Sequence, residues 1–149
     1  MALSDHKIYE TAGRDVMSFV ITSGTVVYDG ALVGINETTG KVVLWTDNSS
    51  AVVTFLGVTE KGGTGNAGAT VEASVNTSGI TLKRITVGGT PTISDITCVG
   101  DLCYATDDNT FTRNAAAEGP VGIITRWYSS TTVDVTLFTP SEFRAYRGS

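Results

Sequence analysis

Short runs of β-branched and aromatic residues alternate with turn residues along most of this chain, and this alternation most constrains its fold. The stretch from Val99 to Phe138 shows the pattern clearly. Within it, Leu102–Tyr104 and Phe111–Arg113 flank Asp107–Asn109, residue types that tolerate left-handed backbone and bond to their own main chain. The three segments together predict a β-hairpin.

A second hairpin is predicted directly afterwards, from Val121–Trp127 and Thr132–Phe138. The later run alternates as a half-buried strand should, with Val133, Val135 and Leu137 on one face. The residues on its opposite face are Thr132, Asp134, Thr136 and Phe138.

The preceding part of the chain repeats this pattern. Seven further runs predict strands: Ser18–Ile21, Thr25–Tyr28, Ala31–Asn36, Lys41–Thr46, Ala51–Glu60, Thr70–Val75 and Ile80–Val87. The glycine-rich segment Lys61–Ala69 predicts a loop, and Gly88–Thr97 predicts irregular structure. Regularly spaced short strands favour a sandwich or barrel. We therefore predict an all-β fold, a small antiparallel β-barrel or sandwich over residues 18–138.

The two terminal segments carry apolar residues that are candidates for an interface with other subunits. Residues 1–17 are polar and aperiodic, and we expect an extended N-terminal arm. It is either a disordered tail or an extension that docks on a neighbouring subunit. Ile8 and Tyr9 are its apolar residues, and Phe19 in the first expected strand is a third interface candidate.

Residues 139–149 form a C-terminal tail that predicts a short helix. Thr139 suits the cap, proline suits the first helical position, and Glu142 completes a capping box. A helix of about two turns is marginal alone. We therefore expect Phe143 and Tyr146 to pack on another surface, which makes them further interface candidates.

Composition and charge exclude several classes of partner. The 149 residues suit one domain, and ten basic against fifteen acidic residues give a formal net charge of −5. The basic residues are scattered and form no stripe that could displace counterions, so we expect no nucleic-acid partner. No apolar run approaches the roughly 20 residues that span a membrane, and the N-terminus lacks the apolar segment of a secretory signal.

Groups that could support catalysis or metal binding are scarce. The single histidine, His6, lies in the expected arm, so no histidine-based triad or metal site can be built. Asp101, Asp107 and Asp108 form the one acidic cluster of interest, and we interpret them as turn residues. Cys98 and Cys103 do not indicate a disulfide framework, and we expect two small buried or half-buried residues. We predict no catalytic residues, no cofactor and no metal.

Two other patterns invite a functional interpretation. Gly63, Gly65 and Gly68 have the spacing of a dinucleotide-binding loop, but a strand rather than a helix is expected to follow, so we regard the match as accidental. Aromatic side chains could form a carbohydrate platform, although core or interface packing is the favoured interpretation. These aromatic residues are Trp45, Trp127, Tyr128, Tyr104 and Tyr28.

A faint internal similarity relates the two halves of the chain. Gly24–Asp29 resembles Gly100–Ala105, and Phe55–Thr59 resembles Pro120–Thr125. We interpret it as two similar β-modules that share one barrel.

The order of these motifs resembles that of the capsid decoration, or cement, proteins of tailed bacteriophages. The resemblance rests on Val99–Phe111, Gly119–Ile124 and Thr132–Leu137, with Gly24–Tyr28 and Gly57-Val58 matching an earlier half of the family pattern. It covers about residues 18–138. Cys103 stands where the family usually has a β-branched residue.

The resemblance implies a structural virion protein that is not an enzyme. Such proteins are small β-barrels, usually homotrimers, on the outer surface of an icosahedral head. Their terminal arms cross to adjacent protomers and capsid subunits, so the implied partners are the major capsid protein and other copies of this chain.

Two alternatives remain at this point. One is an adhesion module, a head-fibre base or a receptor- or glycan-binding domain, that displays Trp45, Trp127 or the glycine-rich loop. The other is a glycan hydrolase that uses Asp101 and Asp108, which would need an ordered carboxylate pair in a cleft.

Overall fold

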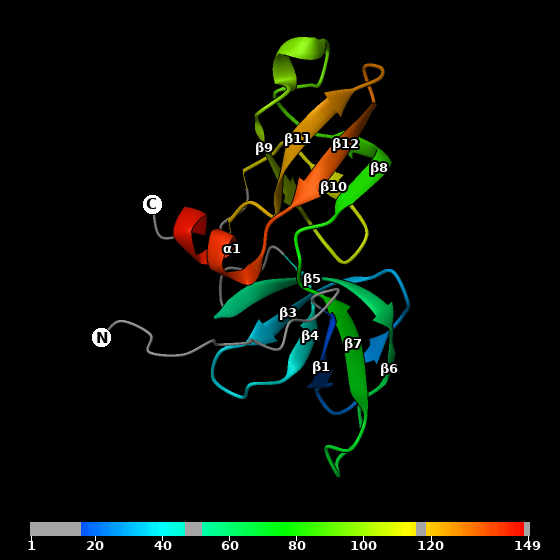
Figure 1. Cartoon of the computed structure of the whole chain (residues 1–149). Coiled ribbons are helices and arrows are strands. Elements are labelled where there is room, and N and C mark those ends of the chain that lie inside the picture. The colour runs from blue at the N-terminus through cyan, green and yellow to red at the C-terminus, as the bar shows by residue number, and fades with distance from the viewer. Residues whose placement is uncertain (1–15, 47–51, 116–118, 148–149) are drawn as a thin grey trace, which may run out of the picture.

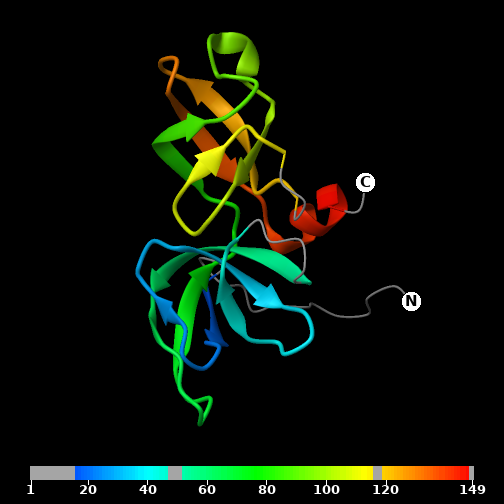
Figure 2. The ribbon, with the colours of Figure 1, turned by 180° about the vertical axis from the view of Figure 1, so that it is seen from behind.

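The computed structural model describes residues 16–46, 52–115 and 119–147. Within these residues the chain forms two β-units, one above the other, with a short helix beside their junction (Figure 1). The lower unit contains strands β1 to β7 and the upper unit contains β8 to β12. Figure 2 shows the same two units from behind.

The lower unit is a five-stranded antiparallel sheet in the order β1-β7-β5-β3-β4. Its strands are β1 (Val16–Val20), β3 (Leu32–Asn36), β4 (Val42–Leu44), β5 (Val53–Lys61) and β7 (Glu72–Asn76). A parallel bridge between Ile21 and Val42 brings the two edges of the sheet together, so the unit is nearly closed. A small ribbon of β2 (Val26–Val27) and β6 (Gly63–Thr64) lies outside the sheet.

The upper unit is a closed barrel in the order β10-β8-β12-β11-β9. Its strands are β8 (Thr81–Gly88), β9 (Leu102–Ala105), β10 (Phe111–Thr112), β11 (Gly122–Trp127) and β12 (Thr132–Leu137). Only the short pairing of β10 with β8 is parallel among these described strands. A 3-10 turn, η1 (Ile96–Cys98), lies in the connection between β8 and β9.

The predicted fold class is confirmed, because the structure is mainly antiparallel β with a closed barrel and one short C-terminal helix. The alternation in β12 is confirmed as well, since Val133, Val135 and Leu137 are buried. Phe138 lies on the expected polar face but is also buried. Its ring stacks on Tyr146 at 4.7 Å, so the helix covers it.

The structure differs from the expected single barrel over residues 18–138, because the chain divides into two closed or nearly closed units. The division follows from long-range pairing: β8 pairs with β12 instead of its predecessor β7. The expected boundary after residue 17 also moves, since β1 already begins at Val16 and pairs there with Asn76. The remainder of the arm lies outside the described residues.

One hydrophobic core joins the two units. Trp45 and Phe55 from the lower unit, Ile124 from the upper unit and Phe143 from the helix belong to the same buried cluster. Trp45 packs edge-to-face against Phe55 and against Phe143, each at a centroid distance of 5.3 Å. A second, smaller cluster fills the lower unit alone. The shared cluster therefore packs the two units around one contiguous core.

The helix α1 (Pro140–Arg147) begins at the predicted capping box. The Glu142 backbone amide donates to Thr139 Oγ1 at 3.3 Å, and the Thr139 amide donates to Glu142 Oε1 at 3.0 Å. These reciprocal bonds satisfy donors that a helix start otherwise leaves without partners.

Two arginines tie the same helix to the lower unit through Glu37. Arg147 lies 2.8 Å and Arg144 lies 3.5 Å from Glu37 Oε1. The hydrogen bonds from Thr54 and then Arg147 lower the pKa of the Glu37 carboxyl. Glu37 therefore stays ionised and holds the helix against the lower sheet.

Candidate functional site

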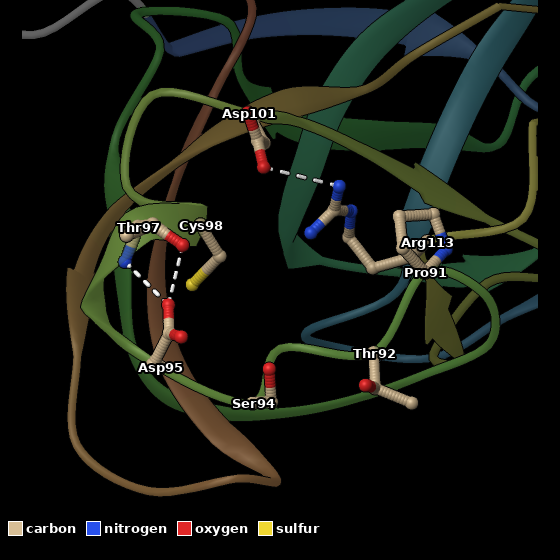
Figure 3. A pocket seen from close by; sticks show the side chains of 8 residues that line it. All are labelled: Pro91, Thr92, Ser94, Asp95, Thr97, Cys98, Asp101 and Arg113. Atoms are coloured by element: carbon tan, nitrogen blue, oxygen red, sulfur yellow. Dashed lines mark hydrogen bonds and ion pairs between the residues drawn. The ribbon is translucent and has the colours of Figure 1, made fainter.

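A polar pocket opens near the end of the upper barrel, beside η1 (Figure 3). Its volume is about 160 Å³. It is lined by Pro91, Thr92, Ser94, Asp95, Thr97, Cys98, Asp101 and Arg113. Most of this lining comes from the segment between β8 and β9, which the sequence predicted as irregular.

The segment that lines the pocket is held by bonds to the barrel beneath it. Trp127 Nε1 donates to the Ile93 carbonyl at 2.9 Å, and the Ile93 side chain is buried in the shared core. Asp95 caps η1, where its carboxylate accepts the Thr97 amide at 2.9 Å and also the Thr97 hydroxyl. These bonds lower the pKa of Asp95, with the Thr97 hydroxyl as the largest cause. The pocket wall is therefore an ordered loop with an ionised carboxylate.

The opposite wall carries an ion pair. Arg113 Nη2 lies 3.1 Å from Asp101 Oδ2, and the two residues come from either side of the β9–β10 hairpin. The Arg113 side chain is only 9% exposed, whereas that of Asp101 is 48% exposed. Sequence analysis missed Arg113. The β9–β10 hairpin brings Arg113 and Asp101 together, and no local sequence motif indicates this pairing.

The two thiols are buried, as predicted, and both are free. Cys98 lines the pocket, whereas Cys103 lies in β9. Burial raises the pKa of the Cys103 thiol from its ordinary 9.0 to about 12, and burial also raises the pKa of Cys98. Neither cysteine is a reactive thiolate at neutral pH.

Thiol accessibility gives a direct test of this arrangement. In Cys98→Ala protein, the remaining Cys103 is expected to stay unreactive towards Ellman's reagent until the protein is unfolded in urea. Because the thiol ionises more readily in the unfolded chain, this residue should lower stability as pH rises from 9 towards 12. Cys103→Ala is the matched control and should weaken that pH dependence. Rapid labelling of Cys103 in folded protein would contradict its burial.

The five interface candidates fall in different environments. Phe19 is partly buried against the lower core, and Tyr146 is 43% exposed. The prediction for Phe143 was wrong, because its side chain is fully buried in the chain's own core. A helix this short gains stability by packing, and the lower unit supplies the surface. Ile8 and Tyr9 lie outside the described residues.

The three aspartates of the acidic cluster make different contacts. Asp107 accepts the Asn109 amide at 3.0 Å within the hairpin turn, as its interpretation as a turn residue requires. The Asp108 carbonyl accepts the Leu32 amide at 2.8 Å and so connects this turn to the lower unit. Asp101 is not a turn residue alone, since it pairs with Arg113.

The tryptophans form no exposed platform. Trp45 is 1% exposed, and its Nε1 donates to the Ala105 carbonyl at 3.1 Å. Trp127 is half-buried and anchors the pocket loop. Core packing, the favoured interpretation, is therefore confirmed for Trp45. Among the described residues, Tyr28 is the most exposed large aromatic side chain, at 71%.

The glycine pattern does not introduce a helix. Gly63 belongs to the short strand β6, which pairs with β2, and the next element is the strand β7. The structural context of a dinucleotide-binding loop is thus absent from this segment of the described chain.

A cationic cluster on the barrel was also missed by sequence analysis. Arg84 and Arg126 lie over the ring of Tyr128, at 4.3 and 4.9 Å from its centroid. Beneath them, buried Asp134 accepts the Tyr128 hydroxyl at 3.0 Å and the Arg84 amide at 2.9 Å. Arg84 has a positive φ of 54° beside irregular β8–β12 pairing. The sequence signal that could have revealed this cluster is Asp134, an aspartate within an otherwise uncharged strand.

No protein-family model matches the chain, and no curated protein matches it. In the described ranges, no helix is long and apolar enough to cross a membrane. The same residues contain no group of three or more histidine, cysteine, aspartate or glutamate side chains arranged to hold a metal ion.

Proposed function

We propose that this chain is a structural virion protein that binds the outer surface of an icosahedral phage capsid. It stabilises the head by clamping neighbouring subunits of the major capsid protein, and it acts as a homotrimer without enzymatic activity. The observation that carries this proposal is the order of sequence motifs, which resembles that of phage decoration proteins. Those motifs fall on strands β2 and β5 of one unit and β9, β11 and β12 of the other.

The architecture supports a mechanical role. The two β-units share one core, and α1 is fastened to the lower unit by the Glu37 ion pairs. The shared core and the ion pairs hold the two units and the helix together as one body. Apolar burial at each contact supplies roughly 25 cal/mol per Å² in gross terms, and several simultaneous contacts slow release.

The proposal is tested with purified protein and expanded capsids that lack it. We expect a trimer by light scattering and saturable rebinding that raises the temperature at which the capsids rupture. A monomer that does not bind the capsids would overturn the proposal.

The N-terminal arm provides a sharper test. Deleting residues 1–15 leaves β1 intact from Val16, so we expect weaker capsid attachment with little change in the thermal unfolding midpoint. The matched control deletes residues 1–20 and removes β1, which pairs with β7 along five residue pairs. That deletion should lower both attachment and stability. Equal loss of stability in the two proteins would show that the arm belongs to the fold.

A further inference from the structure

The pocket beside η1 contains the guanidinium of Arg113, a largely buried side chain. The structure gives the Arg113 side chain one hydrogen bond, from Nη2 to Asp101, among the residues described. A guanidinium has five N–H donors, and this one is nine-tenths buried and directed into the pocket (Figure 3). Among the described residues, the buried polar side-chain atom without a partner is Thr22 Oγ1, so the remaining Arg113 donors are not sealed in the core and stay available to a ligand in the pocket.

The remaining lining supplies both acceptors and hydroxyls around the same space. Asp95 uses one carboxylate oxygen for Thr97, and Asp101 uses one for Arg113, so each retains a second oxygen. Ser94 and Thr92 contribute hydroxyls from the lower wall in Figure 3. Figure 3 shows donors and acceptors interspersed around the pocket, with Asp101 beside Arg113 and Ser94 near Asp95.

Charge and size narrow the class of ligand. Two carboxylates against one guanidinium leave one net negative charge in the lining, which disfavours phosphate and other anions. The pocket volume of about 160 Å³ limits the enclosed part of a ligand to a small group. Vicinal hydroxyls donate to carboxylates and accept from a guanidinium, so a polyol can bond to both kinds of group in this lining. The Pro91 ring adds an apolar wall for the C–H face of such a ligand.

The position of the pocket suits an external ligand. It lies towards the η1 end of the upper barrel, whereas β1 lies in the lower unit (Figure 1). Ile96 and Val99, neighbours of the lining residues, are 67% and 43% exposed. A glycan chain can therefore extend from the pocket over an exposed surface.

We propose that this pocket binds one pyranose unit of a neutral glycan. Arg113 and the Ser94 hydroxyl donate to the sugar oxygens, while Asp95 and Asp101 accept from adjacent sugar hydroxyls. Neither tryptophan lines the pocket, and binding of a glycan there does not require the capsid-binding role.

The test titrates the full-length protein with methyl glycosides of glucose, galactose, mannose and N-acetylglucosamine while backbone amide NMR shifts are followed. We expect saturable shifts confined to residues 91–101 and 113 with at least one glycoside, at a dissociation constant on the order of 1 mM. Methyl glucuronide and inorganic phosphate are the anionic comparisons. Saturation by these anions alone, shifts elsewhere, or no saturable shift would each overturn the proposal.

A matched pair of variants assigns the binding to the pocket. Ser94→Ala removes a lining hydroxyl and should weaken glycoside binding by about threefold to tenfold, the range expected for one hydrogen bond. Ser23→Ala removes an exposed serine from the lower unit and should leave binding unchanged. Unfolding midpoints of both variants should match that of the parent protein. Equal binding by the parent protein and Ser94→Ala would contradict the assigned contact, and with it the proposed site.

Discussion

Replacing Phe143 with alanine is expected to lower the free energy of unfolding by about 3–5 kcal/mol. The ring is fully buried and packs against Trp45 at 5.3 Å and Phe55 at 6.1 Å. Truncation removes its apolar contacts and leaves a cavity at the junction of the two units, because a close-packed β core relaxes only partly. Urea denaturation followed by tryptophan fluorescence measures this loss.

Tyr146→Ala is the matched control on the same helix. This residue is 43% exposed and stacks on one side against Phe138, so its removal should lower stability by only about 1 kcal/mol. If the two variants lost equal stability, the helix as a whole would matter, and the buried ring would not dominate. A stable Phe143→Ala protein would contradict the shared core.

Replacing Gly57 with alanine is expected to be at least as damaging, with a loss above about 4 kcal/mol or failure to fold. Gly57 has φ of +145°, which an L-residue rarely adopts, and an added Cβ would lie 2.1 Å from the Asn76 carbonyl oxygen. That oxygen belongs to the main chain of β7, so the sheet itself would have to move. Soluble yield and the urea midpoint measure the effect.

Gly40→Ala separates the backbone clash from the cost of a positive φ. Gly40 has φ of +70°, but an added Cβ would meet nothing within 4 Å. Its substitution should therefore lower stability by only about 1–2 kcal/mol. Similar losses for Gly57→Ala and Gly40→Ala would mean that the sheet accommodates the extra methyl group.

The elements that sequence analysis predicted well depend on local signals. The alternation of Val133, Val135 and Leu137 reports a strand with one buried face wherever that strand pairs. The capping box at Thr139 and Glu142 likewise needs only four consecutive residues to form. Both features were readable because neither depends on the rest of the fold.

The features that escaped prediction depend on partners distant in the chain. Nothing near Phe143 indicates that Trp45 and Phe55 will cover it, so an internal core residue resembled an interface residue. The pocket has the same origin, because Trp127 fixes Ile93 from 34 residues away and Arg113 reaches Asp101 across a hairpin. The division into two units was hidden for this reason too, since alternation gives a strand its faces but not its neighbours.

The contact of α1 with the lower unit has a consequence for synthesis of the protein. Arg144 bonds to Thr54, which was translated 90 residues earlier, and Phe143 completes the packing around Trp45 and Phe55. The first β-unit therefore leaves the ribosome with an open hydrophobic surface and remains so until the helix emerges. Chains truncated before Pro140 should therefore be more sensitive to protease than the whole chain, as expected when long-range contacts close late.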